Sequence, residues 1–223
     1  MNEIKVLITG ATGFIGTHLT EFLFKQNYKI YCIARDSSNT VKLKGKTEII
    51  NLPLERINEL DDNLIKEFDY IYHFAGITKH YSKDFYYKIN FESTKFLVDK
   101  IIKVQSDKLK RFVYCSSQAA SGPAAGFYAV KETDDDNPIN SYGKSKKMAE
   151  EYILSVKDKI NSIIIRPPAV FGAGEKDIYS YFKLINNKLM LFVGKGNLTF
   201  SIVYVDDLIR ASVKLAENNN IKS

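Results

Sequence analysis

The sequence predicts an α/β domain built on a doubly wound parallel sheet. Short apolar runs of strand length alternate along the chain with segments whose apolar residues recur at helical spacing. In addition, three regularly spaced glycines join the first expected strand to the first expected helix. Strands and helices that alternate in this way form a parallel sheet, which binds its ligands outside the carboxyl ends of the strands.

The first strand, turn and helix lie between Lys5 and Leu23. Gly10 permits a turn that a Cβ would bar, Gly13 lets the backbone approach a ligand closely, and Gly16 lets the helix lie against the strand. The helix start offers unpaired N–H groups and a positive dipole end to a pyrophosphate. The unit therefore predicts a dinucleotide site, with contacts expected from Gly10, Thr12, Gly13, Phe14, Ile15 and Gly16.

The second strand, residues 28–34, ends at the position where dinucleotide-binding proteins distinguish NAD from NADP. An acidic side chain there binds the ribose 2′-hydroxyl of NAD, whereas an arginine accommodates the 2′-phosphate of NADP. Arg35 and Asp36 stand side by side, and spacing alone does not decide between them. Arg35 is the first polar side chain past the strand, so we favour NADP(H); a charged loop without a ligand is the alternative.

The other elements follow from the same periodicities. Further strands are expected at residues 47–51, 70–74, 111–115, 160–165 and 198–205, and helices at 54–68, 85–104, from Asn140 onward, at 178–186, and through Leu215 with Asp206 and Asp207 as its cap. His73 is expected to be a satisfied core histidine, and Ala75 and Gly76 to leave room for a flat ligand. Residues 118–137 are expected to be a long functional loop.

Tyr142 and Lys146 are four residues apart on one predicted helix, so they share a face one turn apart. A nearby ammonium and the positive end of a helix both favour the phenolate. We therefore expect the pKa of Tyr142 to fall by about two or three units, which would let the phenol exchange protons near neutral pH. Ser117, at the end of an adjacent strand, is expected to hydrogen-bond the same substrate oxygen.

The composition limits the class of protein. Hydrophobic residues make up 45% and charged residues 26% of the 223 residues, and no apolar run approaches the roughly 20 residues of a membrane span. The net charge of +6 is spread over amphipathic helices without a basic stripe, which predicts no nucleic-acid partner. Cys32 and Cys115 lie in predicted strands, as expected of free thiols in a reduced cytoplasmic protein. We expect no metal site.

Six segments in order resemble the extended short-chain dehydrogenase/reductase superfamily, whose members include nucleotide-sugar epimerases and dehydratases and dihydroflavonol-reductase-like enzymes. They are residues 9–16, residues 73–76, Ser116-Ser117, Tyr142-x-x-x-Lys146, Arg166-Pro167-Pro168 and residues 204–207. The resemblance implies a Rossmann fold over residues 1–168 and a partial substrate-binding region over 169–223, interleaved with the last Rossmann strand and helix. It implies Ser117, Tyr142 and Lys146 as the catalytic residues, with Tyr142 and Lys146 also touching the dinucleotide.

The resemblance also assigns weaker roles. Ala75, Gly76 and Pro167 would line the dinucleotide, and Asn90 matches an asparagine that many members keep. Many dehydratases carry an Asp-Glu pair after the serine, where this chain has Gln118 and Ala119, so dehydration is disfavoured. Extended members usually continue for about another hundred residues, so we expect a small or truncated C-terminal substrate lobe with weak turnover.

The sequence thus predicts an NAD(P)-dependent oxidoreductase or nucleotide-sugar epimerase, in which Tyr142 moves a hydroxyl proton while a hydride passes to or from NAD(P)(H). Two alternatives remain: a dihydroflavonol-reductase-like carbonyl reductase, and a non-catalytic dinucleotide sensor or assembly subunit. We expect a homodimer formed through helix 85–104 and the helix that carries Tyr142, because in the family these helices pair across a two-fold axis.

Overall fold

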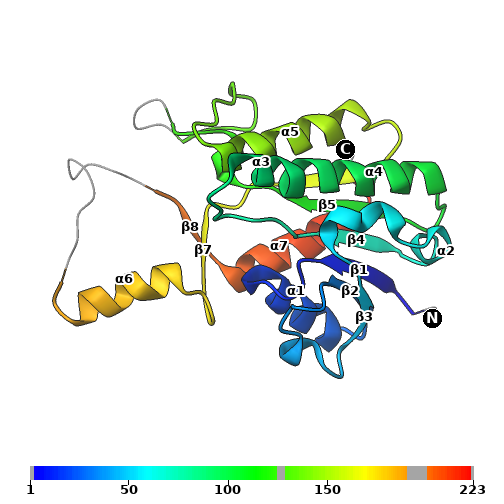
Figure 1. The fold of residues 1–223 in the computed structure, drawn as a ribbon, viewed down its shortest axis with the longest axis horizontal. Helices are drawn as coiled ribbons and strands as arrows, with labels where there is room; N and C mark the ends of the chain where they lie inside the picture. Colours follow the sequence, from blue (N-terminus) through cyan, green and yellow to red (C-terminus); the bar gives the residue numbers. More distant parts are fainter. Residues whose placement is uncertain (1–2, 125–128, 190–199, 222–223) are drawn as a thin grey trace.

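Six strands form one parallel sheet in the order β3-β2-β1-β4-β5-β6 (Figure 1). The computed structural model describes residues 3–124, 129–189 and 200–221. The strands are β1 (Lys5–Thr9), β2 (Lys29–Ala34), β3 (Thr47–Asn51), β4 (Tyr70–His73), β5 (Arg111–Cys115) and β6 (Ser162–Ile165). The strand order reverses between β1 and β4, which confirms the predicted doubly wound sheet.

The sheet is covered on both faces because successive side chains of each strand point to opposite sides. Val6 and Ile8 pack with α1 (Phe14–Lys25) and α7 (Val205–Glu217), while Leu7 packs with α4 (Ser93–Val104) and α5 (Ser141–Ser155). Cys32 and Cys115 are buried and free, as predicted.

The helix predicted at 85–104 is present but not uniform. It begins with α3 (Lys83–Tyr86), continues as a π-helical segment, η3 (Tyr87–Glu92), and ends as α4. Single-turn π segments inside α-helices occur frequently at functional sites. Asn90 lies in this segment and is buried.

The helix predicted at 54–68 is wrong as one element. The chain forms a 3₁₀ helix, η2 (Leu54–Glu59), and then a short α2 (Asp62–Ile65). Leu60 has extended backbone angles, and the Asp61 carboxylate accepts a hydrogen bond from the Asn63 amide at 2.8 Å, so Asp61 starts a new helix. The apolar pattern was nevertheless informative, because Leu60 and Phe68 are both buried in the core.

A second, two-stranded parallel sheet follows β6. It consists of β7 (Ala169–Phe171), which the sequence analysis missed, and β8 (Ile202–Tyr204), which is shorter than the strand predicted at 198–205 because residues 200 and 201 are not in a strand and Val205 begins a helix. Residues 198 and 199 lie outside the described residues. Between β7 and β8 lies α6 (Asp177–Asn186), which stands away from the main sheet (Figure 1).

The predicted cap of the last helix is wrong. Helix α7 begins at Val205, and Asp206 and Asp207 lie in its first turn, where they complement the helix dipole without capping it. Asp206 instead faces His18 at 3.4 Å, and Asp207 pairs with Arg210. By contrast, α5 does have a side-chain cap, since the side chain of Asn140 accepts a hydrogen bond from the Gly143 amide at 2.8 Å.

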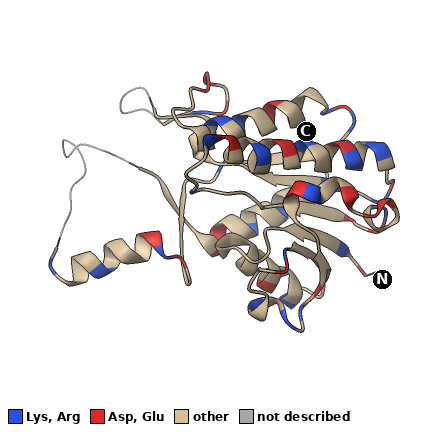
Figure 2. Cartoon of the chain, in the orientation of Figure 1, with Lys and Arg blue, Asp and Glu red and all other residues tan. Residues whose placement is uncertain are grey.

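The remaining loops carry little regular structure. Short 3₁₀ turns occur at η1 (Val41–Leu43) and η4 (Gln118–Ala120), and the latter opens the loop predicted at 118–137. Over the described residues, Lys and Arg are interspersed with Asp and Glu along the ribbon (Figure 2). In the described part of the chain, no helix combines the length and the apolar character needed to cross a bilayer.

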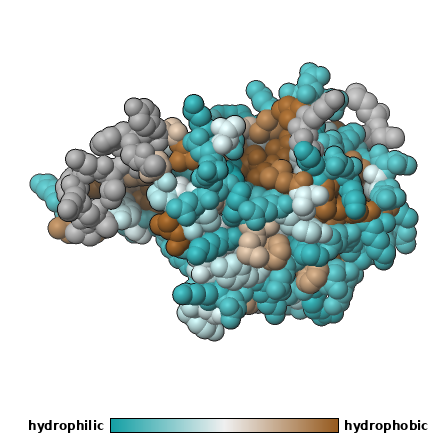
Figure 3. Space-filling model, turned by 90° about the horizontal axis from the view of Figure 1, so that it is seen from above, coloured by the Kyte–Doolittle hydropathy of each residue, from teal (hydrophilic) through white to brown (hydrophobic). Residues whose placement is uncertain are grey.

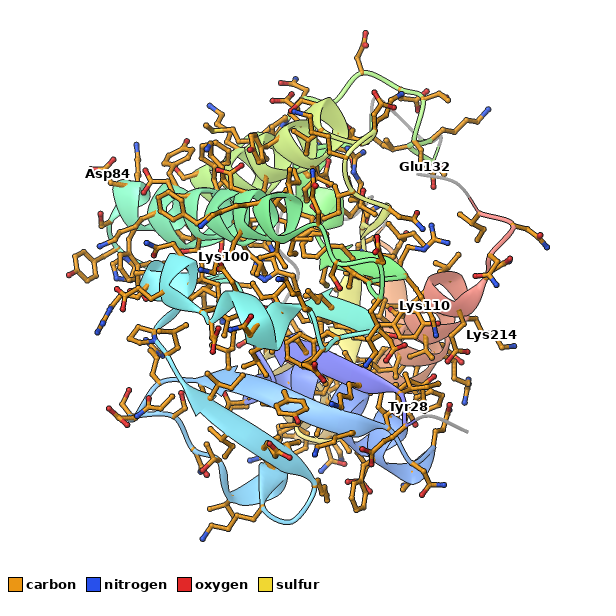
Figure 4. The ribbon with its side chains drawn as sticks, turned by 90° about the vertical axis from the view of Figure 1, so that its right-hand side faces the viewer. Tyr28, Asp84, Lys100, Lys110, Glu132 and Lys214 are labelled. Carbon is orange, nitrogen blue, oxygen red and sulfur yellow. The ribbon has the colours of Figure 1, made fainter. Side chains whose placement is uncertain are left out.

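The amino ends of the strands fasten α7 to the sheet (Figure 4). Tyr28, just before β2, donates a hydrogen bond to Glu217 at the end of α7. Arg111, at the start of β5, donates to the backbone oxygens of Asn218 at 3.0 Å and Ile221 at 2.9 Å. The candidate site lies at the opposite edge of the sheet, at the carboxyl ends of the strands.

Candidate active site

Two adjoining cavities, of about 210 and 500 Å³, lie where the strand order reverses and share Gly10, Gly13, Phe74 and Gly76 as lining residues. The first extends toward the end of β2, and its lining includes Thr12, Arg35 and Ala75. The second extends toward α5, and its lining includes Phe14, Ile15, Gly16, Ser117, Tyr142, Lys146 and Pro167. Every residue predicted for catalysis or dinucleotide binding therefore lines one of the two cavities.

The glycine loop has the geometry that its sequence predicts at two positions. Gly10 has φ +77°, and a Cβ there would lie 2.6 Å from the Ala75 amide nitrogen. A Cβ on Gly16 would lie 2.1 Å from the Gly10 carbonyl oxygen. Gly13 is the N-cap of α1, whose first turn carries no acidic side chain and receives no side-chain cap. The helix start is therefore free to meet an anion.

The two charged residues after β2 lie differently. Arg35 is exposed and lines the first cavity, and its amide donates a hydrogen bond to Ser38 Oγ at 3.2 Å. Asp36 is not among the lining residues of that cavity, and Asn51 donates a hydrogen bond to its carboxylate. Of the two residues, Arg35 is the one that lines the cavity.

The predicted catalytic residues come together on the wall formed by β5 and α5. Lys146 is buried and donates a hydrogen bond from Nζ to the Cys115 carbonyl at 2.8 Å. Ser117 caps η4, its hydroxyl accepting from the Ala119 amide at 3.2 Å. Gly143 explains how α5 comes so close: a Cβ there would lie 2.2 Å from the Ala119 carbonyl oxygen. Sequence reasoning missed this glycine, although it directly follows Tyr142.

The expected fall in the pKa of Tyr142 is not found. Burial raises the pKa of Tyr142, and the hydrogen bond with Ser117 lowers it only in part. The ammonium of Lys146 is directed to the Cys115 carbonyl, and burial lowers the pKa of Lys146 as well. The prediction was wrong because it counted the ammonium and neglected the loss of water around the phenol.

Asn90 holds the segment that follows β4. Its side chain accepts a hydrogen bond from the Ile77 amide at 2.8 Å and donates to the Ile77 carbonyl at 3.1 Å and to Ser145 Oγ at 3.0 Å. Gly76 lies between Asn90 and Lys146, because a Cβ there would be 3.0 Å from Asn90 Oδ1 and 3.1 Å from Lys146 Nζ. The π-helical segment thus contacts α5 through one buried side-chain amide.

A partly buried network of ion pairs anchors α5. Arg166 donates two 2.8 Å hydrogen bonds to Asp136 and also binds Glu150 through Nε at 3.0 Å. Burial opposes ionisation of Asp136, but hydrogen bonds from Arg166 and Lys147 hold its pKa below the usual value. The network joins the end of β6, the loop before α5 and the turn after Lys146.

One further pair was not foreseen. Lys79 and Asp177 form an exposed 2.6 Å ion pair between the loop after β4 and the start of α6, and both line the second cavity. No sequence signal distinguishes these two charges from others on the surface.

A glycine loop at the strand crossover, with a serine, a tyrosine and a lysine on the facing wall, defines the class of NAD(P)-dependent enzymes of the extended short-chain dehydrogenase/reductase type. The profile of the NAD dependent epimerase/dehydratase family matches residues 6–223. The chain belongs to this family, which confirms the predicted resemblance and fold.

Several relatives are longer than this chain. It is 29% identical to the dTDP-D-glucose 4,6-dehydratase of Dictyostelium discoideum, covering 93% of this chain and 54% of that protein. It is 25% identical to the UDP-glucose 4-epimerase of Caenorhabditis elegans, and the match covers 91% of this chain and 66% of that protein. The UDP-glucuronic acid 4-epimerase of Bacillus cereus was solved in complex with UDP-glucuronic acid and NAD, and its sequence is 28% identical to this one. The two structures superpose with a TM-score of 0.79 over 97% of this chain and 74% of that one.

Proposed function

We propose that this protein is a dinucleotide-dependent nucleotide-sugar epimerase that oxidises and re-reduces one carbinol carbon. The observation that carries the proposal is the convergence of Ser117, Tyr142 and Lys146 on the cavity that adjoins the glycine loop. The Bacillus cereus relative, which binds a nucleotide-sugar and NAD, supports the same substrate class.

The residues fit a dinucleotide. Gly10 and Gly16 bring the backbone of the loop together with the start of α1, and Gly76 leaves a space that a Cβ would fill. The pyrophosphate would be held by the loop from Gly10 to Gly16, and the nicotinamide end by Pro167 and Lys146. When bound, NAD(P) accepts and returns the hydride.

The chain's own residues handle the proton. Tyr142 carries a proton in the resting site and hydrogen-bonds Ser117, so the pair can donate to a sugar carbonyl oxygen. The oxidation half of the reaction needs Tyr142 as the phenolate. A positive charge brought near the phenol ring favours this form. Elimination is disfavoured because Gln118 and Ala119 supply neither acid nor base beside Ser117.

The decisive experiment combines dinucleotide retention with a substrate screen. An epimerase keeps its dinucleotide through purification, whereas the second candidate, a dihydroflavonol-reductase-like carbonyl reductase, releases it in each cycle. UDP-, GDP- and dTDP-sugars and small ketones would be tested for epimer formation and for nicotinamide absorbance. Tyr142→Phe should lower turnover by about 10²-fold or more with dinucleotide affinity nearly unchanged.

The exposed Tyr81→Phe is the matched control and should keep full activity. If Tyr142→Phe keeps more than about a tenth of the wild-type rate, the general-acid role is excluded. If the wild type binds a dinucleotide but turns over none of these compounds, the third candidate, a non-catalytic sensor or assembly subunit, is favoured instead.

For the dinucleotide, we propose a modest preference for NADP(H). Arg35 lines the first cavity and Asp36 does not, which supports the reading of Arg35 as a partner of the 2′-phosphate. The NAD in the Bacillus cereus complex supports the opposite choice.

We also propose a homodimer through helix 85–104, which ends as α4, and through α5. Phe96, Met148 and Leu154 are exposed on these two helices, and Figure 3, which looks down on this side, shows hydrophobic surface among hydrophilic side chains. Sedimentation as a monomer at tens of micromolar would exclude the dimer.

The proposal further includes a cytoplasmic location, in keeping with two free cysteines. It also includes a division of the chain at residue 168 into a dinucleotide-binding and a substrate-binding part.

A further inference from the structure

His73 lies at the carboxyl end of β4 and is bound at both ring nitrogens. Nδ1 is 2.6 Å from Thr9 Oγ1, at the end of β1, and Nε2 is 2.8 Å from Thr94 Oγ1, in α4. The ring stacks on Tyr114 with centroids 5.7 Å apart and on Phe112 at 6.1 Å. The residue is fully buried, which confirms the expectation of a satisfied core histidine.

The partners of the two threonines fix the direction of both bonds. Thr94 Oγ1 donates its single proton to the Asn90 carbonyl at 2.8 Å, so it accepts from His73 Nε2. Thr9 Oγ1 accepts from the Ala75 amide at 3.2 Å, and its own proton is directed to His73 Nδ1. The chain of donors therefore runs one way, from the Ala75 amide through Thr9, His73 and Thr94 to the Asn90 carbonyl.

We propose that His73 is a positioning residue, held as the neutral Nε2–H tautomer, that couples the Ala75 backbone in the dinucleotide cavity to the π-helical segment around Asn90. Ala75 lines the first cavity, and Asn90 holds Ile77 and the catalytic helix at Ser145. One imidazole thus connects the two parts of the site that the glycine loop and α5 provide.

The other protonation states satisfy fewer groups. The Nδ1–H tautomer would donate to Thr9 and leave the Thr9 hydroxyl proton without an acceptor among the described residues. An imidazolium would do the same and would add a buried charge near Lys146. Burial, with a smaller effect of Lys146, lowers the pKa of His73 to about 3, in agreement with a neutral ring.

The first test is the tautomer itself, measured on the wild-type protein by ¹⁵N NMR of labelled histidine at pH 7. The chain has three histidines, so His18→Gln and His80→Gln identify the third resonance pair. We expect a protonated Nε2 and an unprotonated Nδ1 for His73. A protonated Nδ1, in either the other tautomer or the imidazolium, would overturn the proposal.

The second test is transmission along the chain. Thr94→Val keeps the shape of the side chain and removes the hydroxyl at the Asn90 end, and exchange of the Ala75 amide proton reports the other end. We expect this exchange to accelerate by about tenfold, the equivalent of one lost hydrogen bond. The control is Ser212→Ala, which removes a buried hydroxyl that donates to the Leu208 carbonyl at 2.7 Å in α7. Equal exchange in the two variants would overturn the coupling.

The functional consequence rests on the proposed function and is measured separately. Thr9→Val and Thr94→Val should weaken dinucleotide binding about tenfold, while Ser212→Ala leaves it unchanged. A merely structural role would lower the thermal midpoint of all three variants and leave affinity equal. If the wild type binds no dinucleotide, the proposed function fails, while the tautomer and the amide exchange still decide the role of His73.

Discussion

Lowering the pH from 7 to 5 should destabilise this protein through one buried imidazole. The pKa of His73 is about 3 in the folded chain, against 6.5 for the free side chain, so protons bind preferentially to the unfolded state. The stability that the neutral ring contributes is fully present above about pH 6.5 and is lost as the pH falls toward 3. At pH 5, about 1.5 units below the unfolded pKa, the loss amounts to about 2 kcal/mol.

This window separates His73 from the paired carboxylates. Glu67 and Asp62 have lowered pKa values, caused first by hydrogen bonds from Lys5 and Lys100 respectively, so the stability that they contribute is lost only below about pH 4.5. Urea unfolding at pH 7, 6 and 5 therefore measures mainly the histidine.

The matched variants are His73→Gln, which cannot titrate, and Thr94→Val, which keeps the imidazole. We expect the pH dependence between 7 and 5 to disappear in His73→Gln and to persist in Thr94→Val, although both are less stable than the wild type. A wild-type stability that is flat between pH 7 and 5, or the same slope in His73→Gln, would refute this reasoning.

Three other substitutions test the site. Gly16→Ala should abolish dinucleotide binding, measured by titration, because its Cβ would lie 2.1 Å from the Gly10 carbonyl oxygen; wild-type affinity would contradict the tight turn. Glu150→Gln should cost about 3 kcal/mol or more in urea unfolding because it leaves Arg166 partly unpaired, while the exposed Glu151→Gln should stay within about 0.5 kcal/mol. Arg35→Ala should weaken the binding of NADP(H) more than that of NAD(H), measured by titration. Equal losses of affinity for both would indicate Asp36, and not Arg35, as the residue that selects the dinucleotide.

The sequence predicted the sheet and the members of the site because these depend on local patterns. Apolar runs located each strand of the main sheet, and the glycine spacing located the start of α1. The loop from Gly10 to Gly16 can be recognised without any distant partner, and Asn140 indicates the start of α5 by its capping side chain alone.

What the sequence did not predict depends on distant partners. The pairing of β7 with β8 joins residues more than thirty positions apart, and each strand is only three residues long. The pKa of Tyr142 depends on how much water the fold removes from the phenol and on where Lys146 points. The link from Thr9 through His73 to Thr94 joins three separate elements, and none of the three residues carries a distinctive local pattern.

The position of α7 bears on how the chain folds during synthesis. Val205, Ile209 and Val213 pack in the same core as Val6 and Leu19, which are made almost two hundred residues earlier. Helix α1 alone therefore covers part of this face of the central strands until the ribosome has released α7, whereas α4 and α5 can cover the other face sooner. Contacts of such long sequence separation slow folding and prolong the exposure of apolar surface, so the nascent chain is expected to need chaperone protection on the α1 side.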